Sequence, residues 1–187
     1  MEILVSPNSF KGTFSSVEAS NIMAKALKDA DSEFNIKKLP IADGGDGTLD
    51  VFKYYFDYKS VKRKYKNPLG NLIETEYIIL DDNNTAIIEF ANASGLNLIN
   101  NNQNNLIKSS SYGTGQQIKS AIKKGVKNIL LCLGGSATID GGTGILRSLG
   151  VKFYDNSSNE ITKGNPLMSI NKFDVSNFIL NRKKINF

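Results

Sequence analysis

Two glycine-rich segments combine acidic side chains with turns of the kind that hold phosphate. Residues 134–144 read Gly-Gly-Ser-Ala-Thr-Ile-Asp-Gly-Gly-Thr-Gly and follow an apolar run, residues 128–133. Glycine lets backbone N–H groups approach an anion closely, and a helix that begins after the turn adds partial positive charge. The segment lacks the Gly-Lys-Ser/Thr ending of a Walker A loop and the G-x-G-x-x-G spacing of a dinucleotide fold. Because Asp140 would repel bare phosphate, we predict that phosphate binds here together with Mg²⁺.

The second segment, residues 43–48, reads Asp-Gly-Gly-Asp-Gly-Thr and precedes a helical pattern. One acidic residue would suffice to cap that helix. Two acids among three glycines can also hold Mg²⁺ through water, or accept a proton from a substrate hydroxyl. We therefore interpret Asp43 and Asp46 as site residues, with a helix cap as the alternative.

Three further features are less specific. Lys11 follows the first predicted strand and either meets a phosphate or carboxylate as a point charge or is a solvated surface lysine. The sequence Gly113-Thr114-Gly115 on its own fits a helix start. Glu89, near the end of an apolar strand, is equally consistent with an edge acid that faces solvent and with a ligand.

Composition excludes several kinds of chemistry. The chain has no histidine, which rules out a Ser-His-Asp triad, a His-ligated zinc ion and a histidine general base within it. The single cysteine, Cys132, excludes an intrachain disulfide and lies in an apolar run, where core packing is the usual role. The net charge of +5 suits an anionic ligand, although lysine is abundant throughout. With no apolar stretch long enough to span a bilayer and no signal-peptide pattern, we expect a cytoplasmic protein without a membrane partner.

The basic run Lys59–Lys66 raises the question of nucleic-acid binding. Its residues alternate in the manner of a strand, with Val61 and Tyr65 on one face and lysines on the other. A strand with one solvated face explains this pattern, so we expect no nucleic-acid partner.

The elements that must position these residues begin as β-loop-α-β-loop-α, which indicates a parallel sheet with ligands at the carboxyl ends of its strands. Ser15 and Glu18 form a predicted capping box for the first helix. Short extended runs then predict a mixed sheet, with a domain boundary near residue 60. Loops are predicted at residues 97–105 and in the polar region from residue 155. The predicted strands are 3–5, 34–41, 59–66, 72–80, 85–90, 128–133 and 151–154, and the later helices are 49–56, 116–124 and 143–149.

Taken in order, five motifs resemble the bacterial class I glycerate kinase family, from residue 1 to about residue 175. They are Ser9-Phe10-Lys11-Gly12, residues 42–48, Ala93-Ser94-Gly95-Leu96, residues 111–115 and residues 134–142. The resemblance implies a two-domain α/β fold: a parallel three-layer α/β domain, to which residues 1–60 contribute the first segment, and a mixed-sheet α/β domain, residues 61–187, here truncated. It also implies a cytoplasmic enzyme that transfers the γ-phosphoryl group of ATP, with Mg²⁺, to a hydroxyl of glycerate.

Carried onto this sequence, the resemblance implies catalytic roles for Lys11, Asp43, Asp46 and Asp140, with Asp140 also a candidate Mg²⁺ ligand. The implied substrate- and nucleotide-binding residues are Ser9, Gly44, Gly45, Thr114, Gly134, Gly135, Ser136, Thr138, Gly141 and Gly142. The chain departs from the family pattern at Asn8, where an aspartate is expected, at Asp46, where glutamate is usual, at Gln116, where glutamate is common, and at Ile139, where asparagine is typical.

Family members are far longer than this chain, so we expect it to pair with a missing C-terminal half. A half-enzyme would leave strand edges and apolar faces uncovered, which predicts low activity and poor solubility for the isolated chain. The alternative is a truncated, catalytically inactive fragment that retains nucleotide or anion binding.

Overall fold

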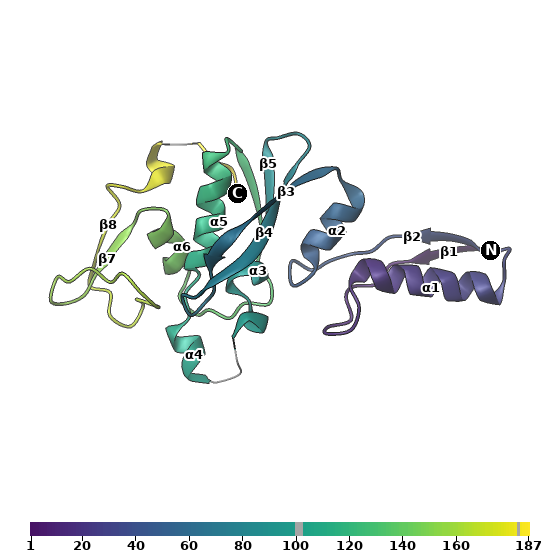
Figure 1. Ribbon diagram of the computed structural model, residues 1–187, viewed down its shortest axis with the longest axis horizontal. Helices are drawn as coiled ribbons and strands as arrows, with labels where there is room; N and C mark the ends of the chain where they lie inside the picture. The colour runs from purple at the N-terminus through teal and green to yellow at the C-terminus, as the bar shows by residue number, and fades with distance from the viewer. Residues whose placement is uncertain (100–102, 183) are drawn as a thin grey trace.

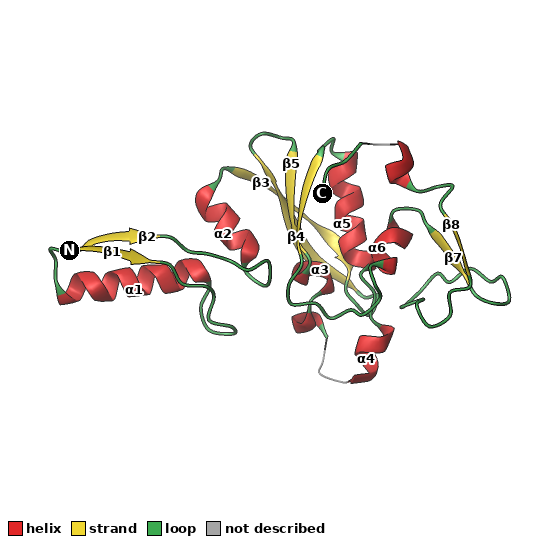
Figure 2. Ribbon diagram, turned by 180° about the vertical axis from the view of Figure 1, so that it is seen from behind, coloured by secondary structure: helices red, strands yellow, loops and turns green. Residues whose placement is uncertain are grey.

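The computed structural model describes residues 1–99, 103–182 and 184–187, and it has a mixed α/β architecture, as predicted. A slender N-terminal arm, residues 1–38, projects from a larger body built around a four-stranded sheet (Figure 1). The opposite view shows the same division, with the arm joined to the body through the segment that leads into α2 (Figure 2).

The arm consists of β1 (Glu2–Val5), α1 (Ser16–Ala30) and β2 (Asn35–Lys38). Its two strands pair in parallel, which confirms the β-loop-α-β prediction. The predicted capping box is present: the Ser15 hydroxyl accepts the Glu18 N–H (3.2 Å), and Glu18 Oε2 accepts the Ser15 N–H (2.8 Å). The arm also exposes apolar side chains, such as Leu4 and Ile22. A two-stranded sheet with one helix is too small to bury them by itself.

The body sheet has the strand order β3-β4-β5-β6. Strands β3 (Tyr58–Lys66), β4 (Leu72–Leu80) and β5 (Thr85–Glu89) are antiparallel neighbours, whereas β6 (Asn128–Cys132) runs parallel to β5. The predicted mixed sheet is therefore confirmed. The parallel connection from β5 to β6 passes through α5, as a crossover between parallel strands requires.

A helix packs against each face of this sheet, because successive residues of β4 point to opposite sides. Tyr77 packs in a core cluster with Ile118 and Ile122 of α5 (Tyr112–Lys123). Ile78 packs in a second cluster with Leu49 of α2 (Thr48–Tyr55). Residues 48–55 therefore lie on the body sheet, and the predicted domain boundary near residue 60 stays a prediction.

Shorter elements complete the chain, and some of them correct the sequence-based predictions. The region 97–105, predicted as a loop, includes the end of η1 (Leu96–Leu98) and the start of α4 (Gln103–Lys108), while residues 100–102 lie outside the described part. The region after residue 155, also predicted as a loop, contains β8 (Lys172–Asp174), which pairs with β7 (Lys152–Tyr154). The remaining elements are α3 (Ala91–Ser94), α6 (Thr143–Ser148) and η2 (Ile179–Arg182).

The helix predicted from residue 116 begins earlier, at Tyr112, and includes two glycines. A Cβ at Gly113 would clash with the carbonyl oxygen of Lys66, so glycine here allows the helix to approach the end of β3. Close packing thus overrides the low helix propensity of glycine. Among the described residues, no helix is long and apolar enough to cross a bilayer.

Candidate active site

A cavity of about 640 Å³ lies where the N-terminal arm meets the body. The loop after β1, the turn after β2 and the turn after β6 line it, together with Asn97 from the segment after β5. All four segments follow the carboxyl ends of strands. Ligands of α/β proteins bind at this edge, so the predicted position of the site agrees with the geometry.

The loop after β1 presents Lys11 at the tip of a tight turn. Phe10 and Phe14 pair across this turn, with the Phe10 N–H donating to the Phe14 carbonyl (2.9 Å). Lys11 and Gly12 are exposed at the rim of the cavity, where Ser9 also contributes to the lining. The lysine charge acts on Asp43 across the cavity and helps to hold the pKa of that carboxyl down.

Asp43 is held in one orientation by two donors. Its Oδ1 accepts the Gly45 N–H (3.0 Å), and its Oδ2 accepts Nδ2 of Asn8 (3.3 Å). These hydrogen bonds, the first of them most strongly, lower the pKa of Asp43 from its ordinary value of 3.8. The carboxylate is therefore charged at neutral pH and suits a cation better than a proton. Asn8, a departure from the family pattern, supplies a donor at this point.

Asp46 lies on the same cavity and has a different partner. Its Oδ2 accepts Nδ2 of Asn97 (3.0 Å), a residue that follows β5 and was not identified from the sequence. The small-residue turn before Asn97 was the available signal, because it placed a polar side chain just beyond a strand end.

The two glycine-rich turns touch one another. A Cβ at Gly134 would lie 2.6 Å from the backbone nitrogen of Gly45, a distance that real side chains do not reach. Gly135 has a φ of +62°, and the carboxylate of Asp46 lies 3.3 Å from the position that a Cβ there would take. Glycine is thus required where the turn after β6 packs against the turn after β2. The contact brings backbone and carboxylates to one wall of the cavity.

The rest of the 134–144 segment leaves the cavity. The Ala137 N–H donates to the Ser94 carbonyl (2.9 Å), and the Leu96 N–H donates to the Gly135 carbonyl (2.9 Å), so the chain runs along the segment after β5. Ser136 forms an isolated bridge with Gly95 in this pairing. Neither Ser136 nor Thr138 lines the cavity.

Asp140 is buried, with 1% of its surface exposed, and its carboxylate is occupied by hydrogen bonds. Its Oδ2 accepts the Ser111 N–H (2.7 Å), the Ser111 hydroxyl (2.9 Å) and the Gly144 N–H (3.0 Å), while its Oδ1 accepts the Gly142 N–H (3.1 Å). This carboxylate ties the start of α5 to the start of α6. It does not line the cavity, and four donors already bind its oxygens, which disfavours it as a ligand of the Mg²⁺ ion expected there.

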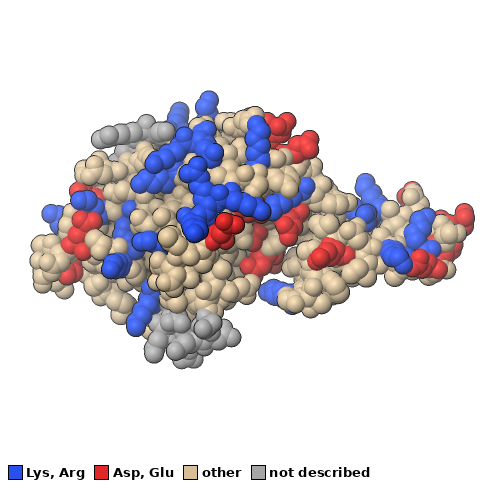
Figure 3. Space-filling view, in the orientation of Figure 1, with Lys and Arg blue, Asp and Glu red and all other residues tan. Residues whose placement is uncertain are grey.

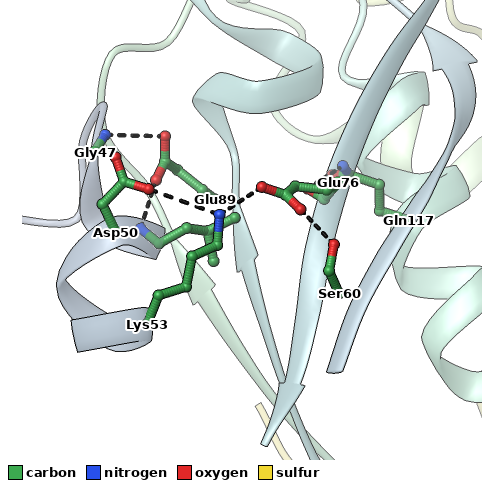
Figure 4. Close-up of polar contacts among 8 residues, drawn as sticks. Gly47, Asp50, Lys53, Ser60, Glu76, Glu89 and Gln117 are labelled. Atoms are coloured by element: carbon green, nitrogen blue, oxygen red, sulfur yellow. Dashed lines mark hydrogen bonds and ion pairs between the residues drawn. The ribbon is translucent and has the colours of Figure 1, made fainter. Parts of the chain in front are cut away.

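Glu89 is also buried, which excludes the solvent-facing edge acid, and it lines a separate cavity of about 330 Å³. Its carboxylate accepts the N–H groups of Gly47 (3.2 Å) and Leu49 (2.8 Å) at the start of α2 (Figure 4). Burial raises the pKa of Glu89 above its ordinary value, and these two hydrogen bonds oppose the rise. Beside it, Lys53 forms an ion pair with Glu76. Glu89 is thus neither a solvent-facing edge acid nor a residue of the main cavity.

The structure places some of the predicted site residues around the cavity and the others elsewhere. The predicted residues that line the cavity are Ser9, Lys11, Asp43, Gly45, Asp46, Gly134 and Gly135, with Gly44 inside the same turn. Those outside the lining are Thr114, Ser136, Thr138, Asp140, Gly141 and Gly142. Thr114 is buried and shares a hydrogen bond with the Ser94 hydroxyl (2.7 Å), which joins α5 to α3. No group of three or more His, Cys, Asp and Glu side chains arranged to hold a metal occurs in the described ranges.

Comparison with known proteins gives a consistent result. The model of the glycerate kinase family matches residues 3–187. Glycerate kinases from Bacillus subtilis and Haemophilus influenzae are 34% and 36% identical to this chain, each over 94% of it. The glycerate 2-kinase of Escherichia coli is 34% identical over the same share.

A solved structure of a glycerate kinase 2 from Salmonella typhimurium LT2 has a similar fold. It superposes with a TM-score of 0.79 at 32% identity, covering 97% of this chain but 49% of the other. The chain likewise spans 46–47% of the Bacillus, Haemophilus and Escherichia proteins. It therefore corresponds to about half the length of the relatives it matches.

Proposed function

The chain belongs to the glycerate kinase family, and we propose that it forms the N-terminal part of an enzyme that phosphorylates D-glycerate with ATP to give phosphoglycerate. The observation that carries this proposal is the apposition of the two glycine-rich turns around one cavity with Lys11, Asp43 and Asp46. Phosphoryl transfer is catalysed mainly by positioning and by charge stabilisation, and these residues supply both.

The donor set fits a magnesium ion. Asp43 and Asp46 line the same cavity, and Mg²⁺ is commonly held by one or two carboxylates together with phosphate oxygens and water. When bound, the ion would neutralise charge on the phosphate groups. Asp43 is the better candidate ligand, because its lowered pKa and two fixed donors keep it charged and oriented. Asp140 does not fit this role, since N–H and hydroxyl donors already fill its oxygens.

The other residues of the cavity have complementary roles. Lys11, on its exposed turn, is placed to meet a phosphate or the glycerate carboxylate as a point charge. Asp46, which Asn97 orients through a hydrogen bond, would accept the proton of the substrate hydroxyl. The backbone of Gly134 and Gly135 lies against these carboxylates without side chains that would block a ligand.

We further propose that the remaining half of the enzyme covers the arm and the rim of the cavity. Leu4 of the arm, Ile41 after it, and Leu133 and Ile139 around the turn after β6 are 59%, 45%, 70% and 59% exposed. Apolar surface of this extent commonly marks an interface. A catalytically inactive fragment that retains nucleotide or anion binding is the second candidate, favoured by the same exposure.

A coupled ADP-release assay with Mg-ATP and D-glycerate tests the kinase, on the chain alone and combined with the C-terminal half of a relative. Asp43→Asn and Asp46→Asn should each remove most of the turnover, whereas Asp57→Asn, an exposed carboxylate away from the cavity, should not. Asp140→Asn is a poor control, because that carboxylate holds the fold together.

The two candidates differ in outcome. Turnover that depends on Asp43 and Asp46 supports the kinase. ATP binding by the chain with no turnover in any combination would support the inactive fragment. Turnover that is unchanged in both cavity variants would refute the proposed site.

A further inference from the structure

A smaller cavity on the body is lined by basic side chains. It has a volume of about 270 Å³ and lies between the turn after β3, the start of α5, α6 and the loop at residues 162–164. We call it the basic pocket, after its charged lining residues Lys66, Lys108, Arg147 and Lys163. It shares no lining residue with the candidate active site.

The charge of the basic pocket is unbalanced. Within the described residues, no aspartate or glutamate lines it. Asp140 is the acidic residue whose charge acts on Arg147, but its oxygens are already bonded to Ser111, Gly142 and Gly144. Four cations around a small cavity repel one another unless an anion lies among them. In Figure 3, basic side chains gather in a band across the body, and acidic side chains lie beside this band and on the N-terminal arm.

Two of the four cations, Arg147 and Lys66, are held in place by contacts with the fold. Arg147 donates from Nη2 to the Gly164 carbonyl (3.0 Å) and from Nη1 to the Ile161 carbonyl (3.2 Å). Its guanidinium carbon and Nζ of Lys66 lie 5.4 Å and 5.0 Å from the centre of the same Tyr112 ring. One aromatic ring thus positions two cationic groups beside the pocket.

Arg147 is also partly buried, and the loss of water around its guanidinium is unfavourable. Burial lowers the pKa of its guanidinium, which means that the fold places a charge where water solvates it poorly. Its Nε is buried and has no hydrogen-bond partner among the described residues. A bound anion would compensate this desolvated charge.

The turn after β3, which also lines the basic pocket, is held by its own hydrogen bonds. Oδ1 of the buried Asn67 accepts the N–H groups of Leu69 and Asn71 (3.0 Å each), and the Asn67 N–H donates to the Asn71 carbonyl (2.7 Å). This turn is therefore formed before any ligand arrives, which reduces the entropic cost of binding.

We propose that the basic pocket binds a compact anion of the phosphate or phosphate-monoester class. The volume is just below the range of about 300–1,000 Å³ typical of pockets for drug-sized ligands, so a small anion suits it better than a nucleotide. The proposal stands independently of the kinase activity, because it concerns residues outside the candidate active site.

The test is isothermal titration calorimetry of the 187-residue chain at constant ionic strength. Inorganic phosphate and glycerol phosphate are titrated in separate experiments. Saturable binding is expected, and Lys66→Gln and Lys163→Gln should each weaken it about tenfold. Lys64→Gln is the matched control, since this exposed lysine lies two residues away on the same strand and does not line the pocket. Lys11→Gln reports on the candidate active site and should leave this affinity unchanged.

Amide chemical shifts give a readout that does not depend on variants. Phosphate should shift the N–H signals of Leu69, Gly70, Ser110 and Tyr112 in the unmodified chain. The proposal is overturned if binding does not saturate, if Lys66→Gln and Lys163→Gln bind phosphate as tightly as Lys64→Gln, or if the shifts are confined to residues 43–47 and 134–135. Preference between the two ligands distinguishes a site for free phosphate from one for a phosphate ester.

Discussion

The triplet Asp-Gly-Gly occurs twice, at residues 43–45 and 140–142, and the two copies share a side-chain hydrogen bond and a threonine that begins the next helix. In each, Oδ1 of the aspartate accepts the N–H of the second glycine, at 3.0 Å for Asp43 and 3.1 Å for Asp140. In each, the threonine that begins the next helix donates its hydroxyl to a carbonyl of the turn at 2.7 Å. The helices α2 and α6 both follow a left-handed glycine.

The surroundings of the two turns differ. Asp43 is exposed, and its second oxygen meets a single amide donor from Asn8. Asp140 is buried, and its second oxygen accepts three donors, two from Ser111 and one from Gly144. One carboxylate is therefore available to a ligand, and the other is consumed in joining two helices. Both aspartates make the same local hydrogen bond, and the burial of the carboxylate determines whether it can bind a ligand or only stabilises the fold.

The largest effect expected from this comparison is on stability. Asp140→Asn should lower the free energy of unfolding by about 3 kcal/mol, because it removes a buried charge and turns an amide nitrogen toward N–H donors. Asp43→Asn should change it by no more than about 0.5 kcal/mol, as for most surface substitutions. Urea denaturation followed by circular dichroism measures both. Equal losses in the two variants would show that the turns do not differ as described.

The glycines next to each turn provide a second, smaller test. A Cβ at Gly144 would lie 2.5 Å from the Tyr112 nitrogen and 2.7 Å from Oδ2 of Asp140, inside a packed junction of helices. Gly144→Ala is therefore expected to destabilise the fold by about 2 kcal/mol. Gly134→Ala should cost a similar amount, about 2 kcal/mol, because a Cβ there would lie 2.6 Å from the backbone nitrogen of Gly45.

The urea midpoint and the binding of Mg-ATP together separate these two cases. Gly134→Ala should weaken nucleotide binding more than it weakens the fold, and Gly144→Ala should do the reverse. A Gly134→Ala protein that binds as well as the unmodified chain would contradict the proposed role of the contact between the two turns.

Much of the fold could be predicted from the sequence. The strands at residues 72–80 and 85–89 were predicted to within a residue, because alternating or continuous apolar runs end at clear turn signals. The capping box at Ser15 was predicted from two residues, because it is a local interaction. The start of α5 was not, since Gly113 is explained only by the carbonyl of Lys66, far away in sequence.

For the site too, the sequence predicted local features but not contacts between distant segments. Lys11, Asp43 and Asp46 were predicted correctly to lie at strand ends, and the structure brings them to one cavity. Asp140 was indistinguishable from Asp43 by its local sequence, because the donors that bury it come largely from Ser111. Lys66 and Arg147, which meet at one ring, come from segments that no local pattern connects.

The smallest expected effect concerns the acid titration of the exposed turn. The pKa of Asp43 is below 3.8, so its contribution to stability is present above pH 3.8 and is lost as the pH falls through the lower folded value. Asn8→Asp replaces a donor 3.3 Å from Asp43 with a like charge. The pKa of one member of the pair should then rise, and the acid loss of stability should begin at higher pH.

The carboxyl carbon shifts of Asp43 and of the aspartate introduced by Asn8→Asp, followed by NMR across the acid range up to neutral pH, measure this change. Asn21→Asp, which adds the same charge on α1, is the control and should leave the titration of Asp43 unaltered. If both carboxyls of the Asn8→Asp protein titrated below 3.8, the amide of Asn8 would have no part in keeping Asp43 charged. The exposed turn would then owe the low pKa of Asp43 mainly to the Gly45 N–H, with a smaller contribution from the Lys11 charge, and the Asn8 amide would play no part in the comparison with the buried turn.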